Sequence, residues 1–262
     1  MLVEQEGAQL WRTRELWLGS EAAHAEFEWL EACAQFVLRT EALSQSGGLL
    51  PDVQRMAWGI NPALWAPVRG RSVSLRRLGL RDASDVHAML QEPGFVHLYS
   101  RGLPTALPAV EAWLKAAQTP RWPVRRIEFV VVCNSTQQVM GLASLAELSV
   151  DDRRAELLVG IRPTAQRKAL GSAGIEATSL LLHFAFERIG LNKLMSYVYE
   201  DNPHALESTL HLGFLREGIF KNHVWDKALN RFVSIHVQAL SRDDYEGSAV
   251  LQKLRARYLK DV

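Results

Sequence analysis

After residue 70 the apolar positions alternate between the spacing of strands and the spacing of helices. Short runs rich in Val, Ile, Leu and Phe predict strands, and apolar residues three and four apart predict helices. We expect strands at 73–78, 127–133, 139–148, 155–161 and 193–199, and helices at 82–90, 109–118, 172–189 and 203–212. Residues 214–225 and 231–240 predict a hairpin across the turn 226–230. This order is typical of an α+β fold with a mixed sheet flanked by helices.

The first 70 residues differ in composition from the rest of the chain. They hold five of the eight Trp and are net acidic, whereas the remainder is net basic. Residues 21–44 have helical spacing and are followed by a stretch rich in Gly and Pro. We therefore expect a helical N-terminal extension over 1–70, a main domain over 71–245 and a C-terminal helix over 246–262.

Charge and composition exclude several classes of protein. The 30 Lys and Arg residues nearly balance the 29 Asp and Glu residues, so nucleic acid is not expected as the main partner. The chain has no apolar run near the ~20 residues of a membrane span, and its opening lacks the pattern of a secretion signal. Cys33 and Cys133 lie far apart and show no metal-ligand spacing. We expect a cytoplasmic protein with neither membrane nor metal site.

The octapeptide QRKALGSA, residues 166–173, lies between the predicted strand 155–161 and the predicted helix after it. It contains two cations and no acid. The first turn of a helix has backbone N–H groups without intrahelical partners and carries partial positive charge, so it attracts anions. The pattern predicts a loop that binds phosphate.

Two further features follow in the chain. Asp201-Asn202-Pro203 comes directly after the strand 193–199, and Gly213-Phe214 lies eleven and twelve residues beyond Asn202. With these motifs and the Q-x-x-A-x-G bend, residues 71–241 resemble the GNAT superfamily of acyl-CoA-dependent N-acyltransferases, and residues 191–225 resemble its RimJ/RimL branch. The resemblance implies a mostly antiparallel sheet in which two central strands, 155–161 and 193–199, splay apart.

The resemblance also implies acetyl-CoA as the acyl donor, bound in that gap, and no metal. The pantetheine arm would pair with the backbone of Val159, Gly160 and Ile161, opposite Asn202. The pyrophosphate would rest on the backbone of Gln166, Arg167, Lys168, Ala169, Leu170, Gly171 and Ser172. Ala169 stands where the family usually has Gly, and its methyl group narrows the approach of the backbone to the ligand. We expect weakened but not abolished binding of CoA.

Amine acetylation needs a base, because an ammonium with a pKa near ~10.4 must lose a proton before it attacks. Glu156 in the strand AELLVGI matches the glutamate that serves as the base in the resembling branch. The alternative is a surface carboxylate paired with Arg153 or Arg154. Backbone N–H groups around Leu158 to Gly160 would polarise the thioester carbonyl.

The departing thiolate needs a proton, and the family's usual donors are missing. Seven residues after Asn202 the family often has Tyr, where this chain has Thr209. The neighbouring branch has a Ser three residues after the Asn, where this chain has Ala205. Ser208, Thr209 and Tyr199 are the remaining hydroxyl candidates.

The acceptor pocket is expected to border the strand 214–225, with His223 and Trp225 as candidate substrate contacts against simple packing of the hairpin. The basic run 121–126 is a further candidate contact, for an anionic acceptor or for the 3′-phosphate of CoA, against a solvated loop.

The leading hypothesis is an enzyme that moves acetyl from acetyl-CoA to a primary amine of a small metabolite. One alternative acceptor is a protein N-terminus. The other alternative is a catalytically degenerate sensor or scaffold that binds acyl-CoA, a drift with which Ala169, Ala205 and Thr209 agree. Members of the resembling family often pair, which makes a homodimer an open alternative to a monomer.

Overall fold

The structure is a computed structural model that describes residues 66–118, 125–149, 151–163, 172–227 and 229–259. The predicted helical extension therefore lies almost wholly outside the described residues. The same is true of Gln166, Arg167, Lys168, Ala169, Leu170 and Gly171 in the predicted phosphate loop.

The described chain builds one sheet of eight strands in the order β1-β2-β3-β4-β5-β6-β8-β7. The strands are β1 Val68–Arg69, β2 Val73–Arg77, β3 Ile127–Cys133, β4 Val139–Ser149, β5 Arg154–Ile161, β6 Lys193–Tyr199, β7 Leu215–Asp226 and β8 Arg231–Ser241. Neighbouring strands are antiparallel except for β5 and β6, which are parallel. The predicted α+β fold with a mixed, mostly antiparallel sheet is confirmed.

Helices lie in connections between the strands and after the last strand. They are α4 Ala83–Leu90, α5 Phe95–Tyr99, α6 Leu107–Gln118, α8 Ala173–His183, α9 Pro203–His211, α10 Arg242–Gly247 and α11 Ala249–Tyr258. A 3-10 turn, Leu80–Asp82, precedes α4, and a π-helical turn, Phe184–Arg188, continues α8. The short helix α5 has no counterpart among the predicted elements. Among the described helices, none combines the length and the apolar character that crossing a membrane requires.

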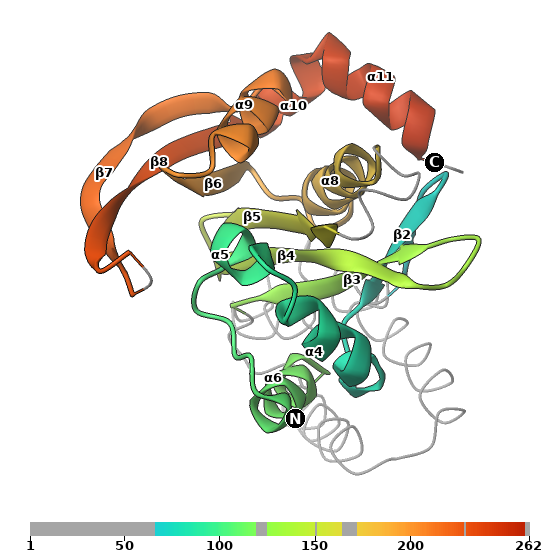
Figure 1. The fold of residues 1–262 in the computed structure, drawn as a ribbon. Coiled ribbons are helices and arrows are strands. Elements are labelled where there is room, and N and C mark those ends of the chain that lie inside the picture. The colour runs from blue at the N-terminus through green and yellow to red at the C-terminus, as the bar shows by residue number, and fades with distance from the viewer. Residues whose placement is uncertain (1–65, 119–124, 150, 164–171, 228, 260–262) are drawn as a thin grey trace, which may run out of the picture. The chain divides into compact units, whose positions relative to one another are not determined.

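Helices cover both faces of the sheet. Successive residues of a strand point to opposite faces, so neighbouring residues of β3 pack against different helices. Val130 and Leu142 pack in a buried cluster with residues of α4, α5 and α6. Their neighbour Phe129 points to the other face, where its ring meets Phe184, directly after α8, edge to face at 5.0 Å. Figure 1 shows α4 and α6 away from α8 across the sheet. Both faces of the central strands are therefore buried.

The parallel pair β5 and β6 separates along its length. Three pairs join the strands, Arg154 with Lys193, Ala155 with Leu194 and Glu156 with Met195. Beyond them β6 continues to pair with β8, and residues 157–161 of β5 continue to pair with β4. The central strands are thus splayed, as the sequence predicted.

Helix α5 is fixed against β5 by a close contact. The Tyr99 ring lies so near Gly160 that a Cβ atom at this glycine would be 2.6 Å from the ring carbon Cδ2. Only glycine leaves room for this approach. The contact holds α5 beside the part of β5 that has separated from β6.

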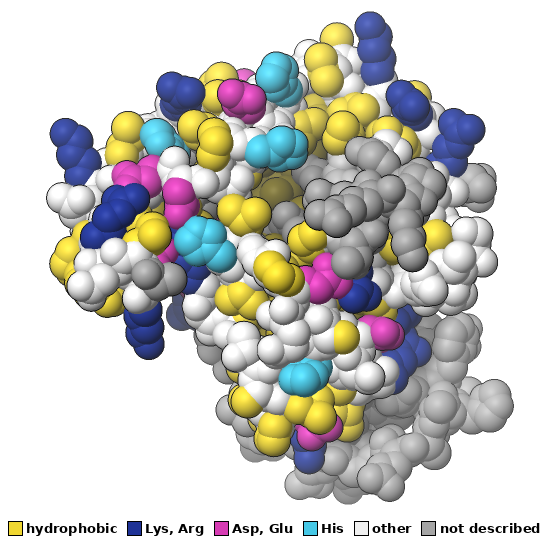
Figure 2. All heavy atoms as spheres, viewed as in Figure 1, with side chains coloured by type: hydrophobic (Ala, Val, Ile, Leu, Met, Phe, Trp, Pro, Cys, Tyr) yellow, Lys and Arg dark blue, Asp and Glu magenta, His cyan; other side chains and the backbone are white. Residues whose placement is uncertain are grey.

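The surface agrees with the near balance of charges. Figure 2 shows acidic, basic and apolar side chains interspersed on the visible face, without a field of one sign. On β7 and β8 several large apolar side chains are half exposed, among them Leu215, Ile219 and Phe232. The homodimer stays a prediction.

Candidate active site

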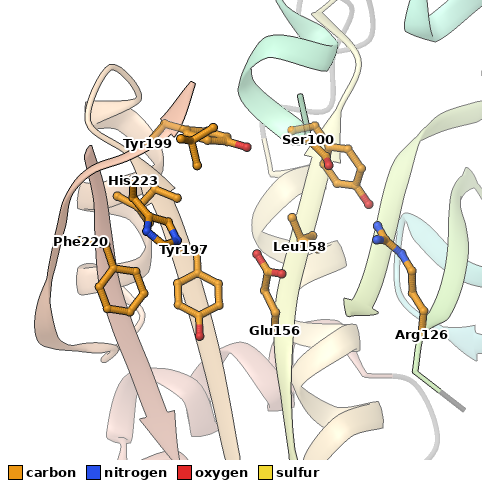
Figure 3. A pocket seen from close by; sticks show the side chains of 11 residues that line it. Ser100, Arg126, Glu156, Leu158, Tyr197, Tyr199, Phe220 and His223 are labelled. Atoms are coloured by element: carbon orange, nitrogen blue, oxygen red, sulfur yellow. The ribbon is translucent and has the colours of Figure 1, made fainter. Parts of the chain in front are cut away.

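A pocket of about 410 Å³ opens where β5 and β6 part. It is lined by Tyr99, Ser100, Arg126, Glu156, Leu158, Tyr197, Tyr199, Phe220, His223, Val224 and Ile235. In Figure 3 Glu156 and Leu158 rise from β5, with Arg126 on one side and Tyr197, Tyr199, Phe220 and His223 on the other. The pocket therefore spans the gap between the splayed strands.

Strand alternation explains which side chains enter the pocket. Glu156 and Leu158 are two residues apart on β5, and Tyr197 and Tyr199 are two apart on β6, so each pair lies on one face. Glu156 is opposite Met195, which shares the face of Tyr197. The carboxyl and the two phenols consequently point to the same side of the sheet.

Glu156 is the carboxyl that lines this pocket. Burial raises its pKa from 4.5 to about 7, with a further increase from the charge of Glu147, while Arg126 acts in the opposite direction. A carboxyl with a pKa near the working pH is suited to take up and release protons. Arg154, one of the two arginines considered as a surface partner of Glu156, pairs with Asp152 at 3.3 Å.

Arg126 enters the pocket from the start of β3. Its Nε lies 2.8 Å from Oε1 of Glu128. The Trp113 indole donates to both oxygens of the same carboxyl, at 3.1 and 2.9 Å. Burial raises the pKa of Glu128, and Arg126 and Trp113 counter that increase. Glu128 thus anchors the guanidinium through one of its five N–H groups.

Two tyrosines form the walls above β5 and β6. Tyr99 shares a hydrogen bond with the Ser144 hydroxyl at 3.2 Å, and burial raises its pKa to about 12. Burial also raises the pKa of Tyr199. Both phenols are therefore protonated at neutral pH.

A network of charged side chains joins α5 to the ends of β6 and β7. Arg101 donates to both oxygens of Asp201, at 2.6 and 2.7 Å, and to Asp226. His97 Nε2 lies 2.9 Å from Asp201, and the Arg101 guanidinium stacks on the Tyr199 ring at 4.0 Å. His97, Asp201 and Asp226 are close enough together to hold a metal ion, but the Arg101 guanidinium supplies the positive charge between the two carboxyls. The network ties the two sides of the pocket together.

The predicted site residues take different positions. Glu156 and His223 line the pocket, and Val159, Gly160 and Ile161 lie on the separated part of β5. Ser208, Thr209 and Trp225 are not among the residues that line it. The Thr209 hydroxyl contacts Gln238 and the Ala205 carbonyl, and Trp225 packs edge to face on Phe232 while 46% exposed.

The two predicted residues at helix starts are also described. Asn202 caps α9, since its side chain accepts a hydrogen bond from the Ala205 N–H at 3.2 Å. Its amide nitrogen lies 3.5 Å from the Leu98 carbonyl of α5. Ser172 occupies the N-cap position of α8. The roles expected of Asn202 and Ser172 toward CoA stay predictions.

Sequence reasoning gave no specific pocket role to Tyr99, Tyr197, Phe220 or Arg126. Tyr197 and Phe220 lie on predicted strands and Tyr99 outside the predicted elements, and none of the three belongs to a motif that assigns it a site role. Arg126 is the last residue of the basic run 121–126, which is a candidate anion contact. Next to it, the Leu148 N–H of β4 donates a hydrogen bond to the Arg125 carbonyl. Arg126 of this run lines the pocket.

Comparison with known proteins identifies the family. Residues 72–215, more than half of the chain, match the acetyltransferase (GNAT) domain. The chain belongs to the GNAT acetyltransferase family. The RimJ/RimL branch within that family stays a prediction.

Two curated relatives of this GNAT chain are N-acetyltransferases described as uncharacterized. Protein p20 of Bacillus licheniformis is 23% identical over 119 residues, 45% of this chain and 64% of its own length. YoaA of Bacillus subtilis strain 168 is 26% identical over 105 residues, 40% of this chain and 54% of its own length. The chain thus spans less than two thirds of the length of these relatives.

Solved structures share the GNAT fold. Spermidine N-acetyltransferase from Vibrio cholerae, in complex with CoA and spermine, has a TM-score of 0.57 at 20% identity, covering 67% of this chain and 99% of that one. A GCN5-related N-acetyltransferase from Brucella melitensis has a TM-score of 0.61 at 19% identity, covering 73% and 85%. At such low identity these likenesses support the fold alone.

Proposed function

We propose that this GNAT chain transfers an acetyl group from acetyl-CoA to a primary amine of a small molecule, with Glu156 as the base. The observation that carries the proposal is the position of Glu156. It lines the pocket at the point where β5 and β6 separate, and its pKa is about 7. Family membership supplies the reaction class.

The separated part of β5 fits the acyl donor. Residues 157–161 pair with β4 along one edge, whereas the pairing of β5 with β6 stops at Glu156. An extended amide-containing arm pairs well with such an open strand edge. Helix α8 follows, with Ser172 as its N-cap, and its first N–H groups would be offered to the phosphates. Acetyl-CoA would supply an activated acyl group there.

Glu156 would take one proton from the bound ammonium, so that the nitrogen lone pair can form the N–C bond while the C–S bond breaks. Two protons leave the nitrogen in total, and one of them ends on the released thiol. Backbone N–H groups of residues 158–160 that are not used by β4 would polarise the acyl carbonyl.

Tyr199 is the candidate that would protonate the thiolate. Of the three hydroxyls considered from the sequence, it is the one that lines the pocket. Its raised pKa keeps the phenol protonated and ready to donate at neutral pH. The phenolate would then recover the second proton from the nitrogen, directly or through water, so that this proton reaches the thiol by way of Tyr199.

A small acceptor agrees with the size of the pocket. About 410 Å³ lies at the lower end of the ~300–1,000 Å³ range of small-molecule sites. The Vibrio cholerae relative acts on spermidine, also a small amine. A protein N-terminus is the competing acceptor.

The test measures thiol release from acetyl-CoA across a panel of small amines and short peptides, together with CoA affinity by calorimetry. We expect release with at least one small amine, and a loss of about 10²–10⁴-fold in turnover for Glu156→Gln with CoA affinity unchanged. Glu217→Gln, a change at a surface carboxyl 39% exposed, is the matched control and should keep full turnover. CoA binding without release from any amine would instead identify an acyl-CoA-binding sensor or scaffold.

A further inference from the structure

We propose that the acceptor is an amino acid with an apolar or aromatic side chain, whose carboxylate is bound by Arg126 while its amine faces Glu156. This inference rests on the proposed function and names the substrate class for the same pocket. It follows from the opposite charges of two pocket residues, from their separation and from the aromatic character of the remaining wall.

Arg126 and Glu156 share one face of the sheet across β4. Ile127 pairs with Leu145, which sets Arg126 beside Ala146, and Ala146 pairs with Glu156. Their backbones are therefore two strand spacings apart, about 10 Å. That interval suits a molecule that carries an ammonium and a carboxylate on one carbon, with a hydrogen bond at each end.

The Arg126 guanidinium is held in position for an anion. Glu128 engages Nε at 2.8 Å, and Glu128 is itself fixed by the Trp113 indole. Nη2 also lies 3.5 Å from the Ser144 hydroxyl, which in turn shares a hydrogen bond with Tyr99. Each terminal nitrogen of a guanidinium carries two N–H groups, so the end of Arg126 that lines the pocket can still donate to a carboxylate. The side chain is 37% exposed, so a ligand can reach it.

The opposite wall suits an apolar or aromatic group. The Tyr197 and Phe220 rings stack with centroids 6.2 Å apart, and Phe220 and His223 are 5.0 Å apart. Aromatic faces bury apolar area and accept other rings in offset or edge-on contacts. The third substituent of the amino acid would lie against this wall.

The same charges disfavour a polyamine. Among the described residues that line the pocket, Glu156 is the single carboxyl and Arg126 is a cation. At the Arg126 end a second ammonium would meet a guanidinium together with the Glu128 carboxyl that this guanidinium already engages, so none of these lining residues offers it a carboxyl of its own. The acceptor class therefore differs from that of the spermidine enzymes with the same fold.

The experiment measures kcat/KM by thiol release for phenylalanine and leucine, for the amines that lack their carboxylate, for a peptide with an N-terminal phenylalanine and for spermidine. We expect the free amino acids to exceed their decarboxylated counterparts by about 10–100-fold, the usual size of a charge-assisted contact. Arg126→Gln should remove that preference through KM, and Arg126→Lys should restore part of it. Arg231→Gln, which breaks an arginine–carboxylate pair outside the pocket, should leave it intact.

Equal kcat/KM for phenylalanine and its decarboxylated amine would overturn the inference, as would equal effects of Arg126→Gln and Arg231→Gln. Release with spermidine or with the peptide, but not with free amino acids, would overturn the inference and leave the proposed transferase function standing. No release with any amine, from protein that binds CoA, would overturn both.

Discussion

Glu156 pairs with Met195 in the last of the three pairs that join β5 to β6. The carboxyl therefore stands at the vertex of the gap between the two strands. From this position it meets the pocket on one face of the sheet, while the backbone just beyond it is open toward β6. A base at the vertex would be next to the reactive end of any extended donor that lies along β5.

The pH dependence of turnover should follow the ionisation of Glu156. A base acts in its ionised form, and burial raises the pKa of Glu156 to about 7. We expect kcat/KM to rise as the pH increases through about 7. In Glu156→Gln that rise should shift toward the pKa of the free acceptor amine. An unchanged profile in the variant would remove Glu156 as the titrating group.

The same pKa makes a prediction for stability. A carboxyl whose pKa is higher in the folded than in the unfolded state stabilises the fold fully below the unfolded value, here 4.5, and this contribution is lost as the pH rises through about 7. Glu156→Gln should therefore be more stable than the native chain at pH near ~8, on the order of 2–3 kcal/mol, and the difference should shrink below pH ~4.5. Urea unfolding at the two pH values measures it. If the native chain and Glu156→Gln were equally stable at pH ~8, the raised pKa of Glu156 would be contradicted.

The Arg101 network should contribute strongly to stability. Arg101 is 13% exposed and Asp226 is 3% exposed, so Arg101→Met removes a cation from a buried carboxyl. Loss of one partner of a buried ion pair costs about 3–5 kcal/mol. Lys193→Met is the control, because its pair with Glu217 is 35% and 39% exposed and contributes ~0–1 kcal/mol. Denaturant unfolding compares the two variants, and equal losses would show that the network is not important for the fold.

The contact between Gly160 and Tyr99 should be sensitive to a single methyl group. Gly160→Ala sets a Cβ 2.6 Å from the Tyr99 ring, so α5 must shift, at a cost of about 1–3 kcal/mol. Because Tyr99 is also a pocket wall, the KM for the acceptor should rise. Gly218→Ala on β7 is the control, since nothing lies within 4 Å of its Cβ position. Calorimetric melting and acceptor kinetics measure both effects, and a Gly160→Ala chain as stable as Gly218→Ala would refute the steric argument.

Much of the fold was predictable because it depends on local periodicity. The spacing of apolar residues predicted the strands from residue 73 onward and the long helix after residue 172. The predicted ends lie within a few residues of the observed ones. Helix α5 was missed. Its five residues, FVHLY, form less than two helical turns, and such a short apolar run has no period by which to recognise it.

The sequence by itself determined the strand and helix order and the resemblance that led to Glu156. Tertiary structure alone decided which side chains share the pocket. Arg126 faces Glu156 because strand register brings together residues 30 positions apart, and Tyr99 closes the wall because Gly160 admits its ring. Register and ring packing are contacts between distant segments, and no local pattern along the chain encodes them.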